Sequence, residues 1–554
     1  MASLLEVWSL PGALIFIVCL TVNWTEYVSS RVPKPYLDEF FHVPQAQKYC
    51  EGDYSWDPKI TTPPGLYLVS KLFNPLLGCE TRFLRMQNTV ALCAILPMSY
   101  LILRILRACN NPSKPSTKDS TLFTDVHSAV NIALFPPLFF FSGLYYTDVM
   151  STLVVLFAYT THLASPPSSL SPLLAVSVLL SGILALFFRQ TNIFWVAVFP
   201  AGLAVVNALK ADGPSTASKS KDVTEILRDS WATGRIIDPP VQDANVQDVI
   251  IFVASVVVAA LSKPLLVIKI AMPYAIILAL FAGFVVWNGS VVLGDKSAHT
   301  ATINMPQMLY IWPYFAFFSI PLLVGPFLRL VVPVLPKQIQ TTCDKAMNTS
   351  TYRLPSLLAS SMFVTWALLA VHFNTIIHPY TLADNRHYVF YVFKILRLYP
   401  ALRYIAVPVY FICAWSIINA LATPRRATHS GSESMLKDKG KAGSPPISAD
   451  NQSCPVSFVV IWLAATTLSV VTAPLVEPRY FIIPWVIWRL HVARHTTPNT
   501  EASPSSSTWK SIVDVRMVLE TIWLLAINLA VSYVFLNWTF TWPNEPGNLQ
   551  RFIW

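Results

Sequence analysis

Long apolar runs constrain this chain more than any other feature. Stretches of about 18 or more mostly apolar residues recur from near the N-terminus almost to the C-terminus, and about 20 such residues cross a hydrocarbon core of roughly 30 Å as a helix. Backbone polar groups need partners inside a bilayer, so many such runs predict a helical bundle. Charged residues make up only 12% of the 554 residues, about half their share in soluble domains. We therefore expect an all-α polytopic membrane protein.

A single domain over residues 1–554, with about 13 transmembrane helices, is expected. The first run, 7–24, has no basic residue before it and no small-residue cleavage site after it, which indicates a retained span rather than a signal peptide. Two stretches, 248–262 and 265–287, compete for one crossing, and the longer one is the better span. The other spans are expected at 83–106, 127–147, 148–165, 172–189, 191–209, 307–330, 355–373, 398–421, 455–475, 478–493 and 514–536.

Basic residues predict which loops face the cytosol. The connections 107–126, 210–247, 331–354 and 422–454 carry Lys and Arg among Ser, Pro or Gly, which the positive-inside rule assigns to the cytosol. We expect 210–247 to be partly disordered and 422–454 to be a low-complexity loop. The net charge of +10 is explained by these loops, so nucleic-acid binding is not expected. The lumenal side then receives 25–82, 288–306, 374–397, the turn near 477 and the C-terminal tail.

Cysteine usage and missing motifs disfavour several classes of protein. Eight cysteines in a chain of this size do not form a disulfide framework. Cys50 and Cys79 flank one polar segment and can pair if it faces an oxidising lumen, although connectivity cannot be read from sequence. No Walker loop, paired-Cys zinc spacing or Gly-x-Ser-x-Gly element occurs, which disfavours ATP-driven transport and zinc proteolysis.

The first polar cluster lies in the segment 25–82, where Asp38 and Glu39 are adjacent among apolar residues. A carboxylate in a partly dry site has a raised pKa and can act as a base. An N-cap or a loop salt bridge explains the pair equally well. Further polar and aromatic residues follow in the same segment: His42, Trp56, Asp57 and Lys59.

Two more clusters lie in other loops assigned to the lumen. Lys296 and His299 stand beside small residues, which suits a phosphate but also an ordinary solvated loop. The other of these two clusters follows His378 and offers more sugar- and phosphate-binding groups than an aromatic belt at a membrane edge needs. Its members are Asp384, Asn385, Arg386 and His387.

The last cluster, Glu477 and Arg479, stands at the turn between two expected spans. The two side chains either pair with each other or bind a ligand, and Arg189 at a span end is ambiguous in the same way. A transporter typically puts ionisable residues within its spans, near the midplane. Here they gather in the loops of one side, which favours chemistry at a membrane surface.

Together these clusters resemble the dolichyl-phosphate-glucose-dependent alpha-1,2-glucosyltransferases of asparagine-linked glycosylation. The resemblance runs from near the N-terminus to the last residue, while the loops 210–247 and 422–454 match nothing in it. It implies a GT-C-type bundle in the endoplasmic-reticulum membrane, with an active site formed by lumenal loops. The matching segments are 36–65, 294–307, 378–391, 477–480 and 550–554.

The resemblance also implies a reaction and its partners. The donor is dolichyl phosphate glucose, and the acceptor is the diglucosylated dolichyl-pyrophosphate-linked oligosaccharide, which receives its terminal third glucose. A beta-linked donor and an alpha product imply inversion by one displacement, with no cofactor and no metal. Rival functions are another lipid-phosphate-sugar transferase, which residue chemistry alone does not separate, and a transporter or lipid flippase.

The resemblance implies a role for individual residues of this sequence, and each role is a hypothesis. Asp38 is the expected base on the acceptor hydroxyl, with Glu39 as its close competitor. The donor phosphate and sugar are expected to contact Lys296, His299, Asp384, Asn385, Arg386, His387 and Arg479. The acceptor is expected to contact His42, Trp56, Asp57 and Lys59.

Overall fold

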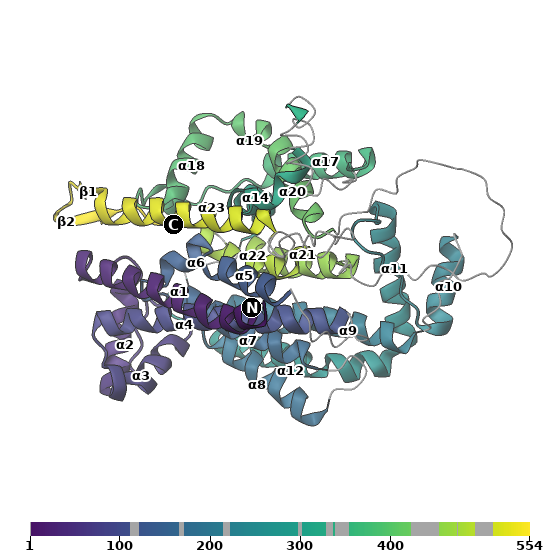
Figure 1. Ribbon diagram of the computed structural model, residues 1–554, viewed down its shortest axis with the longest axis horizontal. Coiled ribbons are helices and arrows are strands. Elements are labelled where there is room, and N and C mark those ends of the chain that lie inside the picture. Colours follow the sequence, from purple (N-terminus) through teal and green to yellow (C-terminus); the bar gives the residue numbers. More distant parts are fainter. Residues whose placement is uncertain are drawn as a thin grey trace.

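The computed structural model describes residues 2–110, 121–165, 171–213, 222–296, 302–327, 336–337, 354–422, 454–473, 475–493 and 514–554. Within these ranges helices dominate, and the sheet is a single two-stranded hairpin. Figure 1 shows the helices α1 and α23 running along the long axis, with α2 and α3 at one end and α10 and α11 at the other. His299 and most of the loop 422–454 lie outside the described residues.

The N-terminal half forms one part of the bundle. Pro136 and Pro137 at the start of α6 lack backbone N–H groups, and the run expected at 127–147 is accordingly divided between α5 and α6. The elements are α1 (Ala2–Arg31), α2 (Glu39–Glu51), α3 (Gly65–Leu77), α4 (Thr81–Asn110), α5 (Thr121–Ala133), α6 (Pro136–Phe141), α7 (Thr147–Leu163), α8 (Pro172–Leu186), η1 (Gln190–Asn192), η2 (Phe194–Val198) and α9 (Phe199–Asp212).

The central elements begin at the end of the bundle away from α2 and α3. There α10 packs against α11, so the described part of 210–247 contains a helix. The elements are α10 (Val223–Thr233), α11 (Val246–Ser262), α12 (Pro264–Asn288), α13 (Gln307–Phe318), α14 (Ile320–Leu323), α17 (Leu357–Asn374), η5 (Pro379–Leu382) and α18 (Tyr388–Leu398).

The C-terminal elements end in the hairpin. Strands β1 and β2 pair antiparallel, with Thr539 opposite Arg551. The elements are α19 (Leu402–Ile405), α20 (Val407–Asn419), α21 (Val456–Val471), η6 (Pro478–Phe481), α22 (Ile482–His491), α23 (Val515–Asn537), β1 (Thr539–Trp542) and β2 (Glu545–Arg551).

The all-α membrane architecture is confirmed, but the count of 13 spans is not. Among the described residues, seven helices are long and apolar enough to cross a membrane, and α12 is one of them. The stretch 248–262 corresponds to the shorter apolar helix α11. Large apolar side chains such as Leu265, Val286 and Leu357 are more than 80% exposed, which suits a surface in contact with lipid rather than water.

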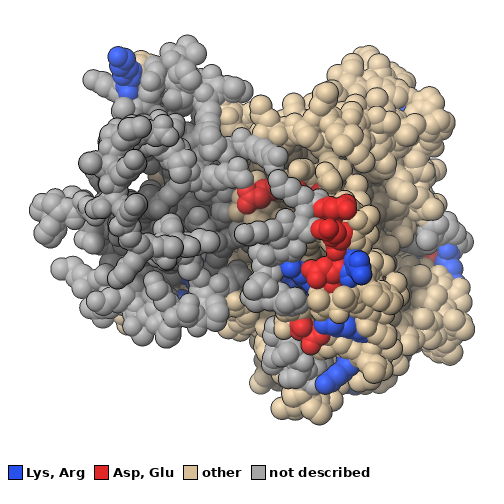
Figure 2. Space-filling view, turned by 90° about the vertical axis from the view of Figure 1, so that its right-hand side faces the viewer, with Lys and Arg blue, Asp and Glu red and all other residues tan. Residues whose placement is uncertain are grey.

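The face at the α10 and α11 end carries a band of mixed charge, with Asp and Glu beside Lys and Arg (Figure 2). Ion pairs at this end join Lys210 to Asp238 and Arg235 to Asp229. These basic residues belong to the connection 210–247, which is expected to face the cytosol.

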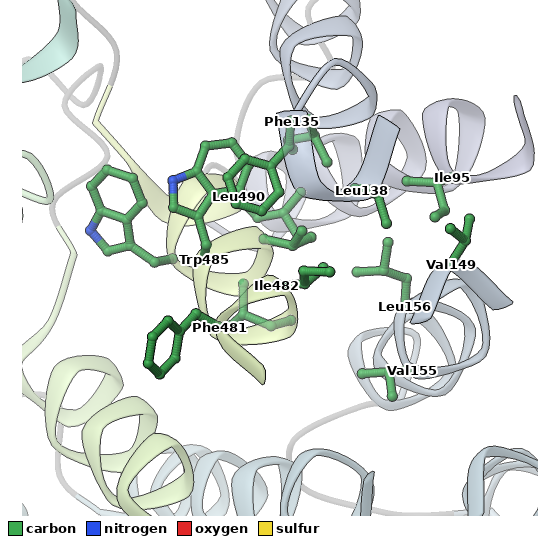
Figure 3. Close-up of a cluster of buried hydrophobic side chains, with 14 of the residues drawn as sticks. Ile95, Phe135, Leu138, Val149, Val155, Leu156, Phe481, Ile482, Trp485 and Leu490 are labelled. Atoms are coloured by element: carbon green, nitrogen blue, oxygen red, sulfur yellow. The ribbon is translucent and has the colours of Figure 1, made fainter. Parts of the chain in front are cut away.

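A buried aromatic and aliphatic core connects α22 to α4, α5, α6 and α7 (Figure 3). The ring of Trp485 stacks on Phe135 with 3.8 Å between centroids, and its indole N–H donates to the Ser319 hydroxyl. Because α22 follows η6 directly, this packing fixes the turn that carries Glu477 and Arg479. Val149, in the first turn of α7, lies in the same core.

Candidate active site

The acidic pair stands at the start of α2, and its two side chains have different surroundings. Leu37 adopts a left-handed conformation with φ of 52°, which a branched L-residue rarely adopts and which is typical of functional sites. The side chain of Asp38 is 40% exposed, whereas that of Glu39 is fully buried. The sequence alone did not separate these two carboxylates.

Glu39 is enclosed by hydrogen-bond donors. Both its carboxylate oxygens accept from the guanidinium of Arg85 on α4, at 2.8 and 2.6 Å. They also accept from the backbone N–H groups of Tyr36 and Tyr145. A carboxylate held by four donors has little capacity left to receive a proton, so Glu39 connects the first loop to α4.

Asp38 occupies the N-cap position of α2, but its side chain caps no backbone N–H. Instead, Oδ2 accepts a hydrogen bond from Nη1 of Arg479 at 2.7 Å. Nη2 of the same guanidinium donates to Glu477, also at 2.7 Å. Burial acts to raise the pKa of Asp38, but the charge and hydrogen bond of Arg479 outweigh it, and the pKa lies below its usual value.

A third carboxylate at this site, Asp148, was missed by sequence reasoning. Its side chain is only 1% exposed, and Oδ2 lies 3.8 Å from Nη1 of Arg479. Its Oδ1 lies 3.0 Å from Nη2 of Arg189, so Arg189, ambiguous in sequence, also belongs to the cluster. Asp148 starts an apolar helix and sits within an apolar run, where a lone acidic residue gives no pattern to detect.

His42, one turn further along α2, faces the same cluster. Burial lowers the pKa of His42 to about 4, and the guanidiniums of Arg479 and Arg189 act in the same direction against the charge of Asp38. Its Nδ1 lies 2.6 Å from the Tyr67 hydroxyl. At neutral pH His42 is therefore an uncharged polar group in the site.

The segment after α2 carries Trp56, Asp57 and Lys59, and it is held by contacts within itself and with α2. Indole Nε1 of Trp56 donates to the carbonyl of Ile60, and Asp57 Oδ1 accepts from the backbone N–H of Lys59. The Lys59 ammonium is exposed and lies 5.8 Å from the ring centre of Phe41.

The loop after α12 packs on this segment. The backbone N–H of Asp295 donates to the carbonyl of Pro58 at 2.7 Å. Gly294 has φ of 62°, and a side chain there would meet that same carbonyl, so both the backbone conformation and the close approach require glycine. Lys296 follows, and its ammonium donates to the carbonyl of Asn288.

The cluster Asp384 to His387 is joined to the C-terminal residues. Arg386 donates to both oxygens of Asp384 and to the side-chain oxygen of Gln550, and its guanidinium lies 4.5 Å from the Trp542 ring centre. The pKa of Asp384 is lowered, because its hydrogen bonds from Arg386 outweigh the effect of burial.

The other two members of this cluster are also held. Asn385 accepts from the indole N–H of Trp542, and Nδ1 of His387 lies 2.9 Å from the backbone oxygen of Trp554. The backbone N–H of Tyr388 donates to the carbonyl of Ile553, and the Tyr36 hydroxyl, from the residue two before Asp38, donates to the carbonyl of Arg551. The C-terminal residues therefore join this cluster to the segment that carries Asp38.

All five segments that carried the resemblance meet at one end of the bundle. Asp38 joins Arg479, and Pro58 joins Asp295, as described above. The Tyr36 hydroxyl donates to the carbonyl of Arg551 at 2.7 Å, and the Gln307 side chain donates to the carbonyl of Ala473 at 2.6 Å. The backbone N–H of Ile553 donates to the carbonyl of Arg386.

Cys50 and Cys79 form a disulfide that joins the end of α2 to the turn between α3 and α4. The sequence had left this pairing open. The bond closes the loop that contains Trp56 and fastens the end of α2, the helix that begins after Asp38.

Within the described ranges, no three His, Cys, Asp or Glu residues are arranged to hold a metal ion. Asp38, Asp148 and Glu477 approach one another, but the guanidinium of Arg479 stands among them. The expectation that the reaction needs no metal stays a prediction.

Comparison with known proteins gives a consistent result. Residues 32–490 match the DIE2/ALG10 family. A protein of Emericella nidulans named Dol-P-Glc:Glc(2)Man(9)GlcNAc(2)-PP-Dol alpha-1,2-glucosyltransferase is 43% identical over 98% of both chains. Proteins with the same name are 41% identical in Aspergillus fumigatus, over 98% of this chain and 97% of theirs, and 31% identical in Homo sapiens, over 95% and 94%. No solved structure matches significantly.

Proposed function

The chain belongs to the DIE2/ALG10 family, and we infer from its near full-length relatives that it is a dolichyl-phosphate-glucose-dependent alpha-1,2-glucosyltransferase. Its donor is dolichyl phosphate glucose, and its acceptor is the diglucosylated dolichyl-pyrophosphate oligosaccharide named for those relatives. The family expected from the sequence is thereby confirmed. Transfer of another sugar, transport and lipid flipping are not favoured.

The observation that carries the mechanism is the contact between Asp38 and Arg479. It places a partly exposed carboxylate beside a buried guanidinium, in the only region where all five family-like segments meet among the described residues. A base for the acceptor hydroxyl and a cation for the donor phosphate are the two groups that a displacement at a sugar phosphate requires.

Asp38 is the base in this proposal. The acceptor 2-hydroxyl oxygen forms a bond to C1 of the glucose while the bond from C1 to the phosphate oxygen breaks. Asp38 takes the hydroxyl proton, and the electron pair of the broken bond leaves on dolichyl phosphate. A single displacement inverts the configuration at C1, so a beta-linked donor gives an alpha-linked product, and no covalent sugar intermediate forms.

Glu39 does not serve as the base in this proposal. Its oxygens are occupied by Arg85 and two backbone N–H groups, and its side chain is fully buried. Asp38 has the exposure that an acceptor needs. The two neighbours thus divide into a chemical role and a structural one.

Arg479 is the main contact proposed for the donor phosphate, and His387 and Lys296 remain predicted donor contacts. Arg386, with Asp384 and Asn385, acts chiefly by fastening the C-terminal hairpin beside Asp38, since Asp384 and Gln550 already occupy its donors. His299 remains a predicted donor contact outside the described residues. His42, Trp56, Asp57 and Lys59 remain the proposed acceptor side of the cleft.

We place the enzyme in the endoplasmic-reticulum membrane with this site facing the lumen. The relatives' substrates belong to lipid-linked oligosaccharide assembly. The disulfide between Cys50 and Cys79 lies in the segment that carries Asp38, and disulfides persist in oxidising compartments. The described part of the basic connection 210–247 lies at the end of the bundle away from α2 and α3 (Figure 1), which agrees with a cytosolic face there.

A donor comparison tests the proposal. The purified full-length chain is given the diglucosylated acceptor with either dolichyl phosphate glucose or dolichyl phosphate mannose, and the product linkage is determined. Transfer of glucose alone, in an alpha-1,2 linkage, supports the proposal. Transfer of mannose, or of glucose in another linkage, contradicts it. Asp38→Asn should lower turnover by about 10²-fold or more, whereas Glu26→Gln, in an exposed ion pair with Arg82, should leave it unchanged.

A further inference from the structure

Asp148 is the one buried carboxylate at the site that lacks well-aligned hydrogen bonds in the described part of the chain. Neither of its oxygens accepts a hydrogen bond there, although guanidinium nitrogens of Arg189 and Arg479 lie 3.0 and 3.8 Å away. A buried charge without such bonds costs stability. A carboxylate kept between two arginines at this cost is therefore a candidate for a functional role.

The two arginines have unequal partners. Arg479 already donates to Asp38 and Glu477 at 2.7 Å each, and its guanidinium carbon Cζ lies 5.3 Å from the centre of the Tyr146 ring. Arg189 makes its carboxylate contact with Asp148 and donates from Nε to the Thr147 hydroxyl at 3.1 Å. Asp148 is thus the carboxylate common to both guanidiniums.

The reaction creates a conflict that Asp148 is placed to resolve. Asp38 cannot accept the hydroxyl proton efficiently while Arg479 stabilises its charged form. An incoming donor phosphate offers Arg479 another anion, but a guanidinium that leaves Asp38 needs a fixed counter-charge to stay in place. Glu477 stays bound to Arg479 alone, whereas Asp148, whose side chain is 1% exposed, lies beside both Arg479 and Arg189. Asp148 therefore provides the fixed charge that keeps the two guanidiniums together, and it is itself too buried to contact the acceptor.

We propose that Asp148 is a positioning residue that holds Arg189 and Arg479 together as a two-guanidinium site for the donor phosphate, which Arg479 binds on leaving Asp38. The proposal rests on the glucosyltransferase function and deepens it. It assigns Arg189 to the phosphate of the prenyl phosphate donor and leaves Asp38 as the only base.

Kinetics with the two substrates varied separately test this assignment. In the full-length chain, Asp148→Asn and Arg189→Gln should each raise the donor KM by about 10- to 100-fold, the range expected for a lost contact to a charged group. The acceptor KM should stay unchanged, and Asp148→Glu should restore much of the donor affinity. Glu26→Gln serves as the matched carboxylate control. Equal increases in both KM values, or a loss of kcat alone, would overturn the proposal.

Binding without transfer separates this inference from the function itself. A short prenyl phosphate without glucose should raise the Tm of the native chain and of Glu26→Gln, but not that of Asp148→Asn or Arg189→Gln. If Asp148→Asn does not accumulate as folded protein, Arg189→Gln alone decides. Equal stabilisation of native and variant chains refutes the two-guanidinium site. Binding by a native chain that transfers no glucose supports the site and refutes the proposed function.

Discussion

Replacing Glu39 by Gln should damage the fold rather than only the chemistry. Glu39 accepts two hydrogen bonds from Arg85 and one each from the backbone N–H groups of Tyr36 and Tyr145. The Arg85 side chain is 1% exposed, so Glu39→Gln leaves a guanidinium buried without its counter-charge. Removing one member of a buried ion pair costs about 3–5 kcal/mol, a large part of the roughly 5–15 kcal/mol that stabilises a typical protein.

Thermal unfolding of the purified chain measures this effect. Glu39→Gln should lower the Tm by several degrees and reduce the amount of folded protein. The double variant Glu39→Gln/Arg85→Gln should be less destabilised than the sum of its single variants, because it removes both charges of one pair. Asp38→Asn is the matched control, and it should keep the native Tm because Arg479 retains Glu477 as a partner.

One result would refute this reasoning about the acidic pair. If Glu39→Gln melts like the native chain yet transfers no glucose, while Asp38→Asn remains active, Glu39 is the base and Asp38 is not. The structure predicts the reverse pattern, since only Asp38 has an exposed carboxylate.

Three further predictions concern the surroundings of the site. Arg479 holds the pKa of Asp38 below its usual value, so activity should persist as the pH falls towards the usual pKa of a carboxyl group. Arg479→Gln should move the acidic limb of the kcat/KM profile to higher pH. A profile whose acidic limb does not move contradicts the pairing. Replacing Cys50 and Cys79 by Ser removes a cross-link between residues 29 apart and should lower the free energy of unfolding by about 3–4 kcal/mol. Labelling of these two thiols in the native chain without reductant would disprove the bond. Gly294→Ala should release its loop from the segment after α2 and lower activity, because φ there is 62° and the new side chain meets a backbone carbonyl. Native turnover in this variant would show that the contact is dispensable.

Periodicity and charge in the sequence were sufficient to predict the membrane architecture and the loops that form the site. Asp38 and Arg479 are 441 residues apart, yet both stood out as charged residues at the edges of apolar runs. Long apolar runs leave few positions for such residues, so the polar exceptions are informative. The count of spans was less predictable, because Pro136 and similar residues divide apolar runs into shorter helices.

The assignment of roles within the site required three-dimensional contacts. Glu39 and Asp38 are chemically alike in sequence, and their partners in the structure, Arg85 for Glu39 and Arg479 for Asp38, separate them. Asp148 gives no signal in a sequence, because a single acidic residue at a helix start is also a common capping feature. Arg386 looked free to bind phosphate until its bonds to Asp384 were seen.

The most direct test of the account uses microsomes that contain this chain and no other enzyme of its activity. They are supplied with dolichyl phosphate glucose and the diglucosylated lipid-linked oligosaccharide, and the glucose residues on the product are counted. The account predicts a third glucose in alpha-1,2 linkage with the native chain and almost none with Asp38→Asn. If the native chain, folded and present in the membrane, adds no third glucose, the central claim is contradicted.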